Sequence, residues 1–201
     1  MTVQQSAAVV PEVRRAVPEE RDAIGRLIGE SFQADPVSSW VFPDEERRRV
    51  VQPRFFGAYL DAALRDGWVD VTDDLSAAAL WLPVPSADDE DLGERLSAAD
   101  PGNERTRIVG ELTGRVHPAD RAHYYLPVIV AAPGRQGQGR GRALLAPVMD
   151  RCDREGTPAY LEASSERSKA LYERLGFTLL GDVIRLPEGP RMWPMWREPR
   201  S

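Results

Sequence analysis

The sequence predicts an α/β fold in which helices flank a sheet of mixed strand direction, and three observations support this prediction. Strand-like and helix-like patterns alternate along the whole chain of 201 residues. Hairpin-like pairs of strands stand near both ends, at 68–82 and 177–197. Between them, residues 124–162 read as a strand, a glycine-rich loop, a helix and a second strand.

Length and composition favour one globular domain. Hydrophobic residues make up 42% of the chain and charged residues 29%, which are ordinary values. We expect residues 1–10 to form a flexible tail and residues 11–201 to form a single domain, because no long low-complexity linker divides them.

The charge and the apolar runs exclude several classes of partner. The net charge is −6 and no basic face is evident, so we expect no nucleic-acid partner. No apolar run approaches the roughly 20 residues that cross a bilayer, which argues against a membrane partner. The first ten residues lack a signal-peptide pattern, and Cys152 is the single cysteine, so a cytoplasmic location is expected.

The elements of the first 120 residues follow from apolar spacing and turn signals. Helices are expected at 19–32, where Asp35-Pro36 ends the pattern, at 44–65 and at 106–116. Strands are expected at 13–16, 68–71 and 77–82. The polar segment 83–103 has four acidic residues at 88–91. It forms either a solvated loop or short helix, or a mobile wall that gates a cleft for a cationic substrate.

The C-terminal half is more informative. Residues 124–132 form a continuous apolar run, which predicts a strand buried on both faces, and Pro127 predicts a bulge, a bend or an unpaired edge within it. A helix is expected over 140–155, ended at Gly156. The remaining expected elements are a strand at 159–162, a helix at 167–175 and strands at 177–184 and 191–197.

The loop Gln136-Gly137-Gln138-Gly139-Arg140-Gly141 is the first candidate site. It stands between a buried strand and a helix N-terminus, where unpaired backbone N–H groups and the helix dipole attract anions. Arg135, Arg140 and Arg142 add positive charge around it. The dinucleotide fingerprint fails because Arg142 replaces its third glycine, and no Lys-Ser or Lys-Thr pair completes a P-loop.

The spacing Gln136-x-x-Gly139-x-Gly141 resembles the pyrophosphate loop, Q/R-x-x-G-x-G/A, of the GNAT superfamily of acetyltransferases. The segment from Leu171 to Phe177 (LYERLGF) is similar to the L-Y-x-x-x-G-F segment of the same superfamily, and it follows the loop as it does there. Within that superfamily, residues 137–199 are similar to the puromycin N-acetyltransferase group. The first 120 residues match less recognisably.

The resemblance implies the acyl-CoA N-acyltransferase fold, with a mainly antiparallel twisted sheet of six to seven strands flanked by helices. Residues 11–120 would form mainly the acceptor side and residues 121–201 mainly the acetyl-CoA side. Acetyl-CoA is then the cosubstrate, and no metal is expected because two histidines and one cysteine offer no cluster. The implied coenzyme contacts are Ile129, Val130, Ala131, Gln136, Gly137, Gln138, Gly139, Arg140, Gly141, Arg142, Ser165 and Ser168, the two serines standing in for an asparagine of many members.

The resemblance also implies a general acid, Tyr172, which would protonate the leaving thiolate. We favour Glu162 as the general base that deprotonates the acceptor amine, although a carboxylate there could instead pair with Arg167 or cap the next helix. A backbone N–H of Val130 or a neighbour would hold the oxyanion. Weaker candidates for the base are His123, unless it is a surface histidine, and Glu30 and Asp35.

The expected reaction is acetyl transfer from acetyl-CoA to a primary amine of a small molecule, by direct attack in a ternary complex of a monomer or homodimer. The antibiotic amines are one possible class of acceptor. The alternatives are a catalytically silent acyl-CoA-binding module, a protein N-terminal or lysine acetyltransferase, and a nucleotide- or phosphate-binding domain. Five tryptophans either line an aromatic acceptor pocket or pack in the core and at its edges: Trp40, Trp68, Trp81, Trp193 and Trp196.

Overall fold

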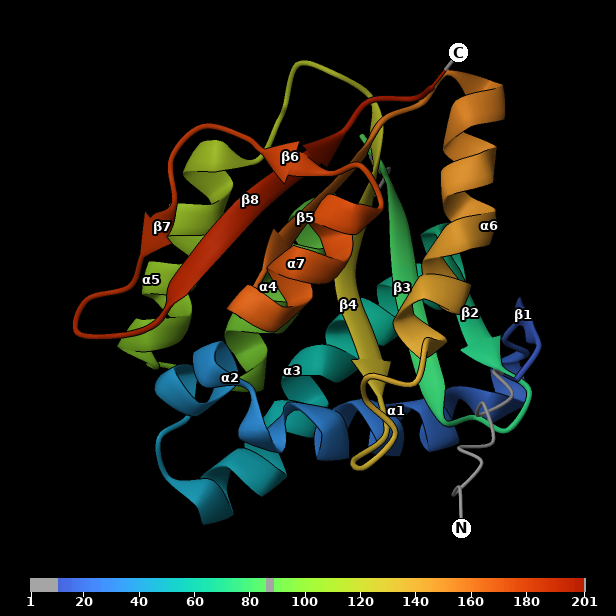
Figure 1. The fold of residues 1–201 in the computed structure, drawn as a ribbon. Helices are drawn as coiled ribbons and strands as arrows, with labels where there is room; N and C mark the ends of the chain where they lie inside the picture. Colours follow the sequence, from blue (N-terminus) through green and yellow to red (C-terminus); the bar gives the residue numbers. More distant parts are fainter. Residues whose placement is uncertain (1–10, 86–88, 201) are drawn as a thin grey trace, which may run out of the picture.

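A computed structural model describes residues 11–85 and 89–200 (Figure 1). The expected tail at residues 1–10 and Asp88 of the acidic segment therefore lie outside the described residues, as do the side chains of residues 89–91. Within the described ranges, no helix is both long enough and apolar enough to cross a membrane.

The strands form one eight-stranded sheet in the order β1-β2-β3-β4-β5-β8-β6, and β7 pairs with β8 beside this path. Their bounds are β1 Val13–Arg15, β2 Trp68–Thr72, β3 Ala77–Val84, β4 His123–Ala131, β5 Ala159–Ala163, β6 Thr178–Leu179, β7 Ile184–Arg185 and β8 Arg191–Arg197. Neighbouring strands are antiparallel except β4 and β5, which run parallel. The predicted mixed, mainly antiparallel sheet is confirmed.

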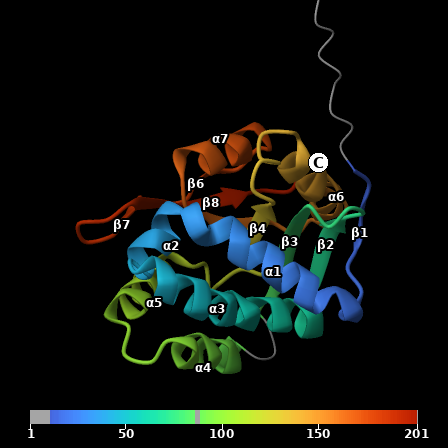
Figure 2. The same cartoon turned by 90° about the horizontal axis from the view of Figure 1, so that it is seen from below.

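Helices cover both faces of this sheet (Figure 2). One face carries α6 (Arg140–Glu155) and α7 (Glu166–Arg174), and the other carries α1 (Arg21–Ser31) and α3 (Glu45–Asp66). Three further helices extend the second layer: α2 Pro36–Val41, α4 Asp89–Ala99 and α5 Glu104–Val116. The crossover from β4 to β5 runs through α6, as the strand–loop–helix–strand pattern predicts.

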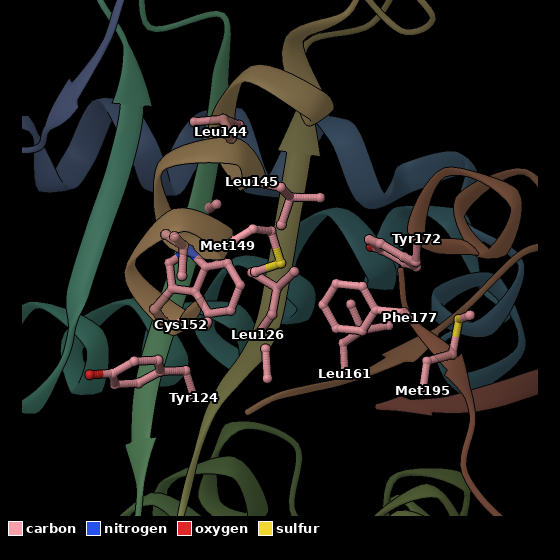
Figure 3. Packing of buried hydrophobic residues seen from close by; sticks show 14 of the residues in the cluster. Tyr124, Leu126, Leu144, Leu145, Met149, Cys152, Leu161, Tyr172, Phe177 and Met195 are labelled. Atoms are coloured by element: carbon pink, nitrogen blue, oxygen red, sulfur yellow. The ribbon is translucent and has the colours of Figure 1, made fainter. Parts of the chain in front are cut away.

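The side chains of β3 alternate between two core clusters. Ala77, Ala79 and Trp81 face α6 and α7, whereas Ala78, Leu80 and Leu82 face α1 and α3, and all six are buried. A strand that is covered on both faces needs apolar residues at every position, which explains why the sequence of β3 is apolar throughout. Figure 3 shows the cluster beneath α6 and α7, with Tyr172 at its margin beside Phe177.

A bulge in β4 opens the middle of the sheet. Leu80 and Leu82 of β3 pair with Val128 and Tyr125 of β4, so β4 has one extra residue in the stretch that contains Pro127. Pro127 cannot donate a ladder hydrogen bond, and the predicted bulge is confirmed there. Beyond the bulge β4 no longer pairs with β5: their pairing is limited to Tyr124 with Ala159 and Tyr125 with Tyr160, and the strands then diverge (Figure 1).

Three expectations need correction. The single strand predicted at 177–184 is wrong: β6 and β7 are separate two-residue strands, because Gly181 adopts a φ of +65° and turns the chain between them. The helix α2 was not predicted. Asp35 caps it by accepting from the Ser38 N–H, and Pro36 is its first residue, so this pair begins a helix as well as ending one. Finally, His123 is 1% exposed and is not a surface histidine.

Gly67 marks the sharpest steric limit of the fold. It follows α3, and a Cβ atom built there would lie 1.9 Å from the carbonyl oxygen of Trp81 in β3. We expect Gly67→Ala to lower the free energy of unfolding by about 2 kcal/mol or more, since neither backbone segment can move without disturbing the sheet. Gly110→Ala is the control: no heavy atom lies within 4 Å of that Cβ on α5, so alanine there should stabilise by up to about 1 kcal/mol. Urea unfolding measures both, and equal effects would contradict the steric argument.

Candidate active site

A cleft of about 1270 Å³ opens where β4 and β5 diverge. All seven described α-helices contribute to its walls, together with β4, β5, β8 and the glycine-rich loop. The loop that follows β4 and the start of α7 after β5 both lie at the carboxyl ends of these parallel strands. Ligand sites of α/β sheets commonly form at this edge. Pockets for one small ligand typically measure about 300–1000 Å³, so this cleft is larger than such a pocket.

The glycine-rich loop is held in the shape of an anion cradle. Gly137 and Gly139 adopt φ values of +78° and +85°, which other residues rarely reach. Gln136 fixes the loop from within: its Nε2 donates to the Ala131 carbonyl at 3.1 Å, and its Oε1 accepts from the Gly134 N–H at 3.0 Å. Gly139 is also the N-cap of α6, so unpaired N–H groups of the first turn point toward the cleft.

Arg140 does not direct its guanidinium into the cleft. The side chain is buried behind the loop, where its Nε donates to Ser76 at 2.7 Å and its Nη2 lies 3.6 Å from Asp74. Its Nη1 donates to Gln138 at 2.7 Å, and Gln138 in turn donates to the Gly134 carbonyl at 3.0 Å. Both side chains therefore stabilise the loop, and only their backbone N–H groups remain as candidates for an anion contact.

The cationic side chains that line this end of the cleft are Arg142, Arg167 and Arg174. Only Arg142 was expected. The Arg167 guanidinium lies against the loop, because a Cβ atom on Gly137 would be 2.9 Å from its Nη2. The sequence left open an ion pair between Glu162 and Arg167, and the structure does not form it. These arginines come from α6 and α7, and their convergence follows from the crossover between β4 and β5.

Ser165 and Ser168 line the cleft, and both are engaged in the cap of α7. The Ser165 hydroxyl accepts from the Ser168 N–H at 3.2 Å, and the Ser168 hydroxyl accepts from the Ser165 N–H at 3.2 Å. Each serine hydroxyl can make further hydrogen bonds. Their predicted coenzyme contact stays a prediction, and it would add to the cap rather than use a free side chain.

The backbone of β4 directs polar groups into the gap that opens between β4 and β5. The Ala132 N–H donates to the Ser76 carbonyl, and alternation in an antiparallel ladder then directs the N–H and C=O of Val130 to β3. The same alternation points the N–H groups of Ile129 and Ala131 away from β3, toward the gap beside β5. Ile129 or Ala131, rather than Val130, is therefore the candidate donor to an oxyanion.

Tyr172 on α7 lines the cleft and is 4% exposed. Its ring packs against Phe177 at a centroid distance of 5.9 Å, which fixes its direction (Figure 3). Burial, and secondarily the negative charge of Asp35, raise the pKa of its hydroxyl above the ordinary value. The hydroxyl is protonated at neutral pH, as an ordinary tyrosine is, and it can donate a proton to a stronger base, although the raised pKa makes it a weaker acid.

Glu162 on β5 lines the cleft, and its side chain is 5% exposed. Burial raises the pKa of this carboxyl to about 7, although hydrogen bonding from Tyr125 and Tyr160 opposes the rise. The Tyr125 hydroxyl donates to Oε2 at 3.0 Å, while the Tyr160 hydroxyl approaches without full hydrogen-bond geometry. A carboxylate with a pKa near neutrality is suited to remove a proton from an ammonium group.

The other candidate bases occupy different places. Asp35 lines the cleft, where it accepts from the Ser164 hydroxyl at 2.6 Å, and burial raises its pKa. Because Asp35 also caps α2, its carboxylate is already committed to structure. His123 lies behind the cleft wall with its Nδ1 2.8 Å from the Arg121 carbonyl, and Glu30 is exposed on α1. Neither lines the cleft as far as the structure describes its walls.

Phenylalanines and tyrosines, not tryptophans, line one wall of the cleft. Phe32 stacks on Phe56 at 4.2 Å, and Phe55 meets Phe56 edge-on at 5.3 Å. Together with Phe42 and Tyr59 these rings form an aromatic wall. Among the described residues that line the cleft there is no tryptophan, which contradicts the pocket alternative; Trp81, Trp193 and Trp196 are buried in the sheet, in agreement with the packing alternative.

Charges in the cleft are separated by sign. Arg142 and Arg167 stand beside the glycine-rich loop, whereas the lining carboxylates are Asp35, Asp100, Glu104, Glu111 and Glu162, of which Asp100 pairs with Arg47; the other lining cations among the described residues are Arg107 and Arg174. Arg107 pairs with Glu104 and Glu111. One end therefore suits phosphates and the other suits a cation.

Two further observations concern the single cysteine and possible metal ligands. Cys152 is fully buried in the core under α6, and burial raises its thiol pKa to about 11, so it is a packing residue. Across residues 11–85 and 89–200, no group of three or more His, Cys, Asp or Glu side chains is arranged to hold a metal ion.

Comparisons with known proteins agree with this geometry. A crystal structure of histone acetyltransferase HPA2 and related acetyltransferase from Corynebacterium glutamicum superimposes with a TM-score of 0.72 at 26% identity, covering 96% of this chain and 98% of that one. The Drosophila melanogaster polyamine N-acetyltransferase shares the fold with a TM-score of 0.62 at 16% identity, over 92% and 98% of the two chains.

Sequence comparison gives the family itself. An uncharacterized N-acetyltransferase of Schizosaccharomyces pombe is 38% identical over 58 residues, which span 29% of this chain and only 24% of that relative. The sequence profile of the Acetyltransferase (GNAT) family matches residues 52–177, which include β4, the glycine-rich loop and Tyr172. The chain therefore belongs to the GNAT family of acetyltransferases.

Proposed function

We propose that this protein transfers the acetyl group of acetyl-CoA directly to a primary amine of a small molecule, within a ternary complex. The observation that carries this proposal is the cleft itself, which is lined both by Glu162, with its pKa near neutrality, and by the protonated Tyr172, next to an anion cradle. These groups support the roles of base, acid and anion site in the proposed reaction.

In the proposed complex, residues 121–201 hold acetyl-CoA. The N–H groups of residues 136–141 and the guanidinium groups of Arg142 and Arg167 receive the pyrophosphate. The pantetheine arm lies in the gap between β4 and β5, where the N–H of Ile129 or Ala131 points at the thioester oxygen. The contacts of Ser165 and Ser168 would reach the same arm.

The chemistry then needs three proton transfers, two of which involve groups of the protein. Glu162 takes a proton from the acceptor ammonium, and the free amine attacks the thioester carbonyl carbon. A C–N bond forms as the C–S bond breaks, the departing thiolate takes the proton of the Tyr172 hydroxyl, and the nitrogen, positively charged after the attack, releases its second proton to solvent. The products are the N-acetyl amine and coenzyme A, and both protein groups return to their starting states by exchange with solvent.

The acceptor side, mainly within residues 11–120, favours an amine that carries an apolar body. The aromatic wall offers contact to that body, and the surrounding carboxylates favour its positive charge. An acceptor with a carboxylate beside its amine would meet like charges. Polyamines are the substrates in the name of one structural relative, so they belong among the acceptors to be tested.

Release of free thiol from acetyl-CoA tests this proposal. We expect turnover with phenethylamine and spermidine, and kcat/KM at least tenfold lower with phenylalanine, whose carboxylate faces the acidic end of the cleft. Puromycin enters the panel because of the C-terminal resemblance, and a lysine peptide enters it because one relative is named a histone acetyltransferase. Turnover of the peptide alone would make a protein the acceptor.

Two other results would replace the proposal. Binding of acetyl-CoA in calorimetry without transfer to any amine of the panel would favour a silent acyl-CoA-binding module. Thermal protection by ATP or NAD, but not by acetyl-CoA, would favour a nucleotide-binding domain. Phe56→Ala adds a check on the acceptor site: it should raise KM for phenethylamine about tenfold, while KM for methylamine stays within about twofold.

A further inference from the structure

Glu162 has one oxygen without a hydrogen-bond partner, although both oxygens are buried. Oε2 accepts from Tyr125, but Oε1 has less than 1 Å² of exposed surface and no hydrogen-bond partner among the described residues. A buried, unpaired carboxylate oxygen is unfavourable, because it has lost its water without gaining a donor. A hydrogen-bond donor that reaches Oε1 would remove this cost.

Two buried groups beside Glu162 could donate: the Tyr160 hydroxyl, which approaches without full hydrogen-bond geometry, and His117, directly after α5. Of the two, His117 is the candidate donor to Oε1, because its ring nitrogen faces that atom. The Nδ1 atom of His117 lies 4.0 Å from Oε1 of Glu162, which is beyond hydrogen-bond range, so the carboxylate must shift toward the ring to accept from it. The His117 ring is held by its neighbours: Tyr125 and Tyr160 each meet it edge-on at 4.8 Å, and His123 lies at 5.2 Å. The ring is therefore positioned for this one carboxylate.

We propose that His117 is a positioning residue for the base: its Nδ1–H donates to Oε1 of Glu162 and holds the carboxylate toward the acceptor amine. This inference rests on the proposed function. It adds a group that lies outside the coenzyme loop and the segment around Tyr172.

The protonation state of His117 suits this role. Burial, with the nearby His123, lowers the pKa of its imidazole to about 4, so the ring is neutral at physiological pH and donates as a neutral N–H. The titratable groups that face the pair come from three elements, namely Tyr59 of α3, His123 and Tyr125 of β4, and Tyr160 of β5. The pKa of every tyrosine in this set is raised, so these groups stay neutral while Glu162 titrates.

The direction of the effect follows from the donor. A hydrogen bond to the ionised carboxylate stabilises the charged form and lowers the pKa of Glu162, so removing His117 should raise that pKa further. His117→Phe keeps the ring and removes the donor. His117→Asn restores an N–H near the position of Nδ1, and it is the matched control.

Two measurements test the inference. Carboxyl-carbon NMR of protein labelled with ¹³C-glutamate follows the titration of Glu162 without any need for turnover, and Glu162→Gln assigns the signal. We expect the pKa of Glu162 to rise by about one unit in His117→Phe and to return to within about 0.3 of wild type in His117→Asn. The acid limb of kcat/KM should move by the same amount, with about a fivefold loss at pH 7.

The outcomes separate the two proposals. An unchanged pKa of Glu162 in His117→Phe, in a variant that circular dichroism shows to be folded, overturns the role of His117. A raised pKa in a protein that acetylates no amine leaves the His117–Glu162 contact in place but removes both its catalytic role and the proposed function. A fall in activity with no shift of the acid limb would mean a structural role only, and it too would overturn the inference.

Discussion

Tyr172→Phe is expected to lower kcat by about 100-fold or more while the dissociation constant for acetyl-CoA stays within about twofold. The variant keeps the ring against Phe177 and loses only the hydroxyl in the cleft. General acids typically contribute about 10²- to 10⁴-fold, and the hydroxyl acts only as the thiolate leaves. Steady-state thiol release gives kcat, and calorimetry gives the affinity for acetyl-CoA.

The matched control is Tyr124→Phe. Tyr124 is also buried, but its hydroxyl donates to Glu155 of α6 at 2.5 Å, away from the cleft. Its loss should leave kcat within about twofold, since the chemistry makes no use of it. A Tyr172→Phe variant with wild-type kcat would show that solvent protonates the thiolate, and Tyr172 would then be only a packing residue.

The pH dependence offers a second check on Tyr172. Burial and the charge of Asp35 raise its pKa, so the hydroxyl should remain protonated throughout the stable range of the protein. We therefore expect no basic limb in kcat/KM up to pH 9. A fall between pH 8 and pH 9 that Tyr172→Phe abolishes would contradict the raised pKa.

The coenzyme half could be predicted from the sequence because its signals are local. A glycine-rich loop needs positive φ values at fixed positions, and the helix after it must start where the N–H groups point, so residues 136–155 carry their own structure. The prediction that the Arg140 side chain contacts an anion relied on the same local pattern, and the side chain lies elsewhere. Its charge suggests an anion contact, but Asp74 and Ser76, some 65 positions earlier, draw its side chain behind the loop.

The acceptor half could not be predicted in the same way, because it is assembled from distant elements. Burial beneath rings of α3, β4 and β5 raises the pKa of Glu162. No sequence pattern around residue 162 indicates that burial. Tyr125 and His117 converge on it only through the sheet and the end of α5. The only sequence signal for His117 was that histidine is rare in this chain, which has two.

Glu162→Gln is expected to lower kcat/KM at pH 8 by about 100-fold and to abolish the acid limb of the pH profile. In the wild-type protein only the ionised carboxylate can accept the proton of the ammonium, so kcat/KM should rise with pH through about 7. Glutamine keeps the shape and an acceptor for Tyr125 but cannot take a proton. Glu155→Gln, on the surface of α6, is the control that should leave the profile unchanged.

The same substitution should stabilise the protein at high pH. The carboxyl has a reference pKa of 4.5 and a folded-state pKa of about 7, so the folded protein binds more protons than the unfolded chain between these values. Stability therefore falls as pH rises through this window, by up to about 3 kcal/mol for the full shift. Glutamine carries no such penalty.

We accordingly expect Glu162→Gln to unfold at higher urea than wild type at pH 8, by about 1–3 kcal/mol, and the two proteins to have nearly equal stability near pH 4.5. A catalytic base held in a dry site weakens the fold that holds it, so loss of activity together with a gain of stability identifies Glu162 as that base. Loss of both would instead mean that the carboxylate serves the structure, through its bond from Tyr125.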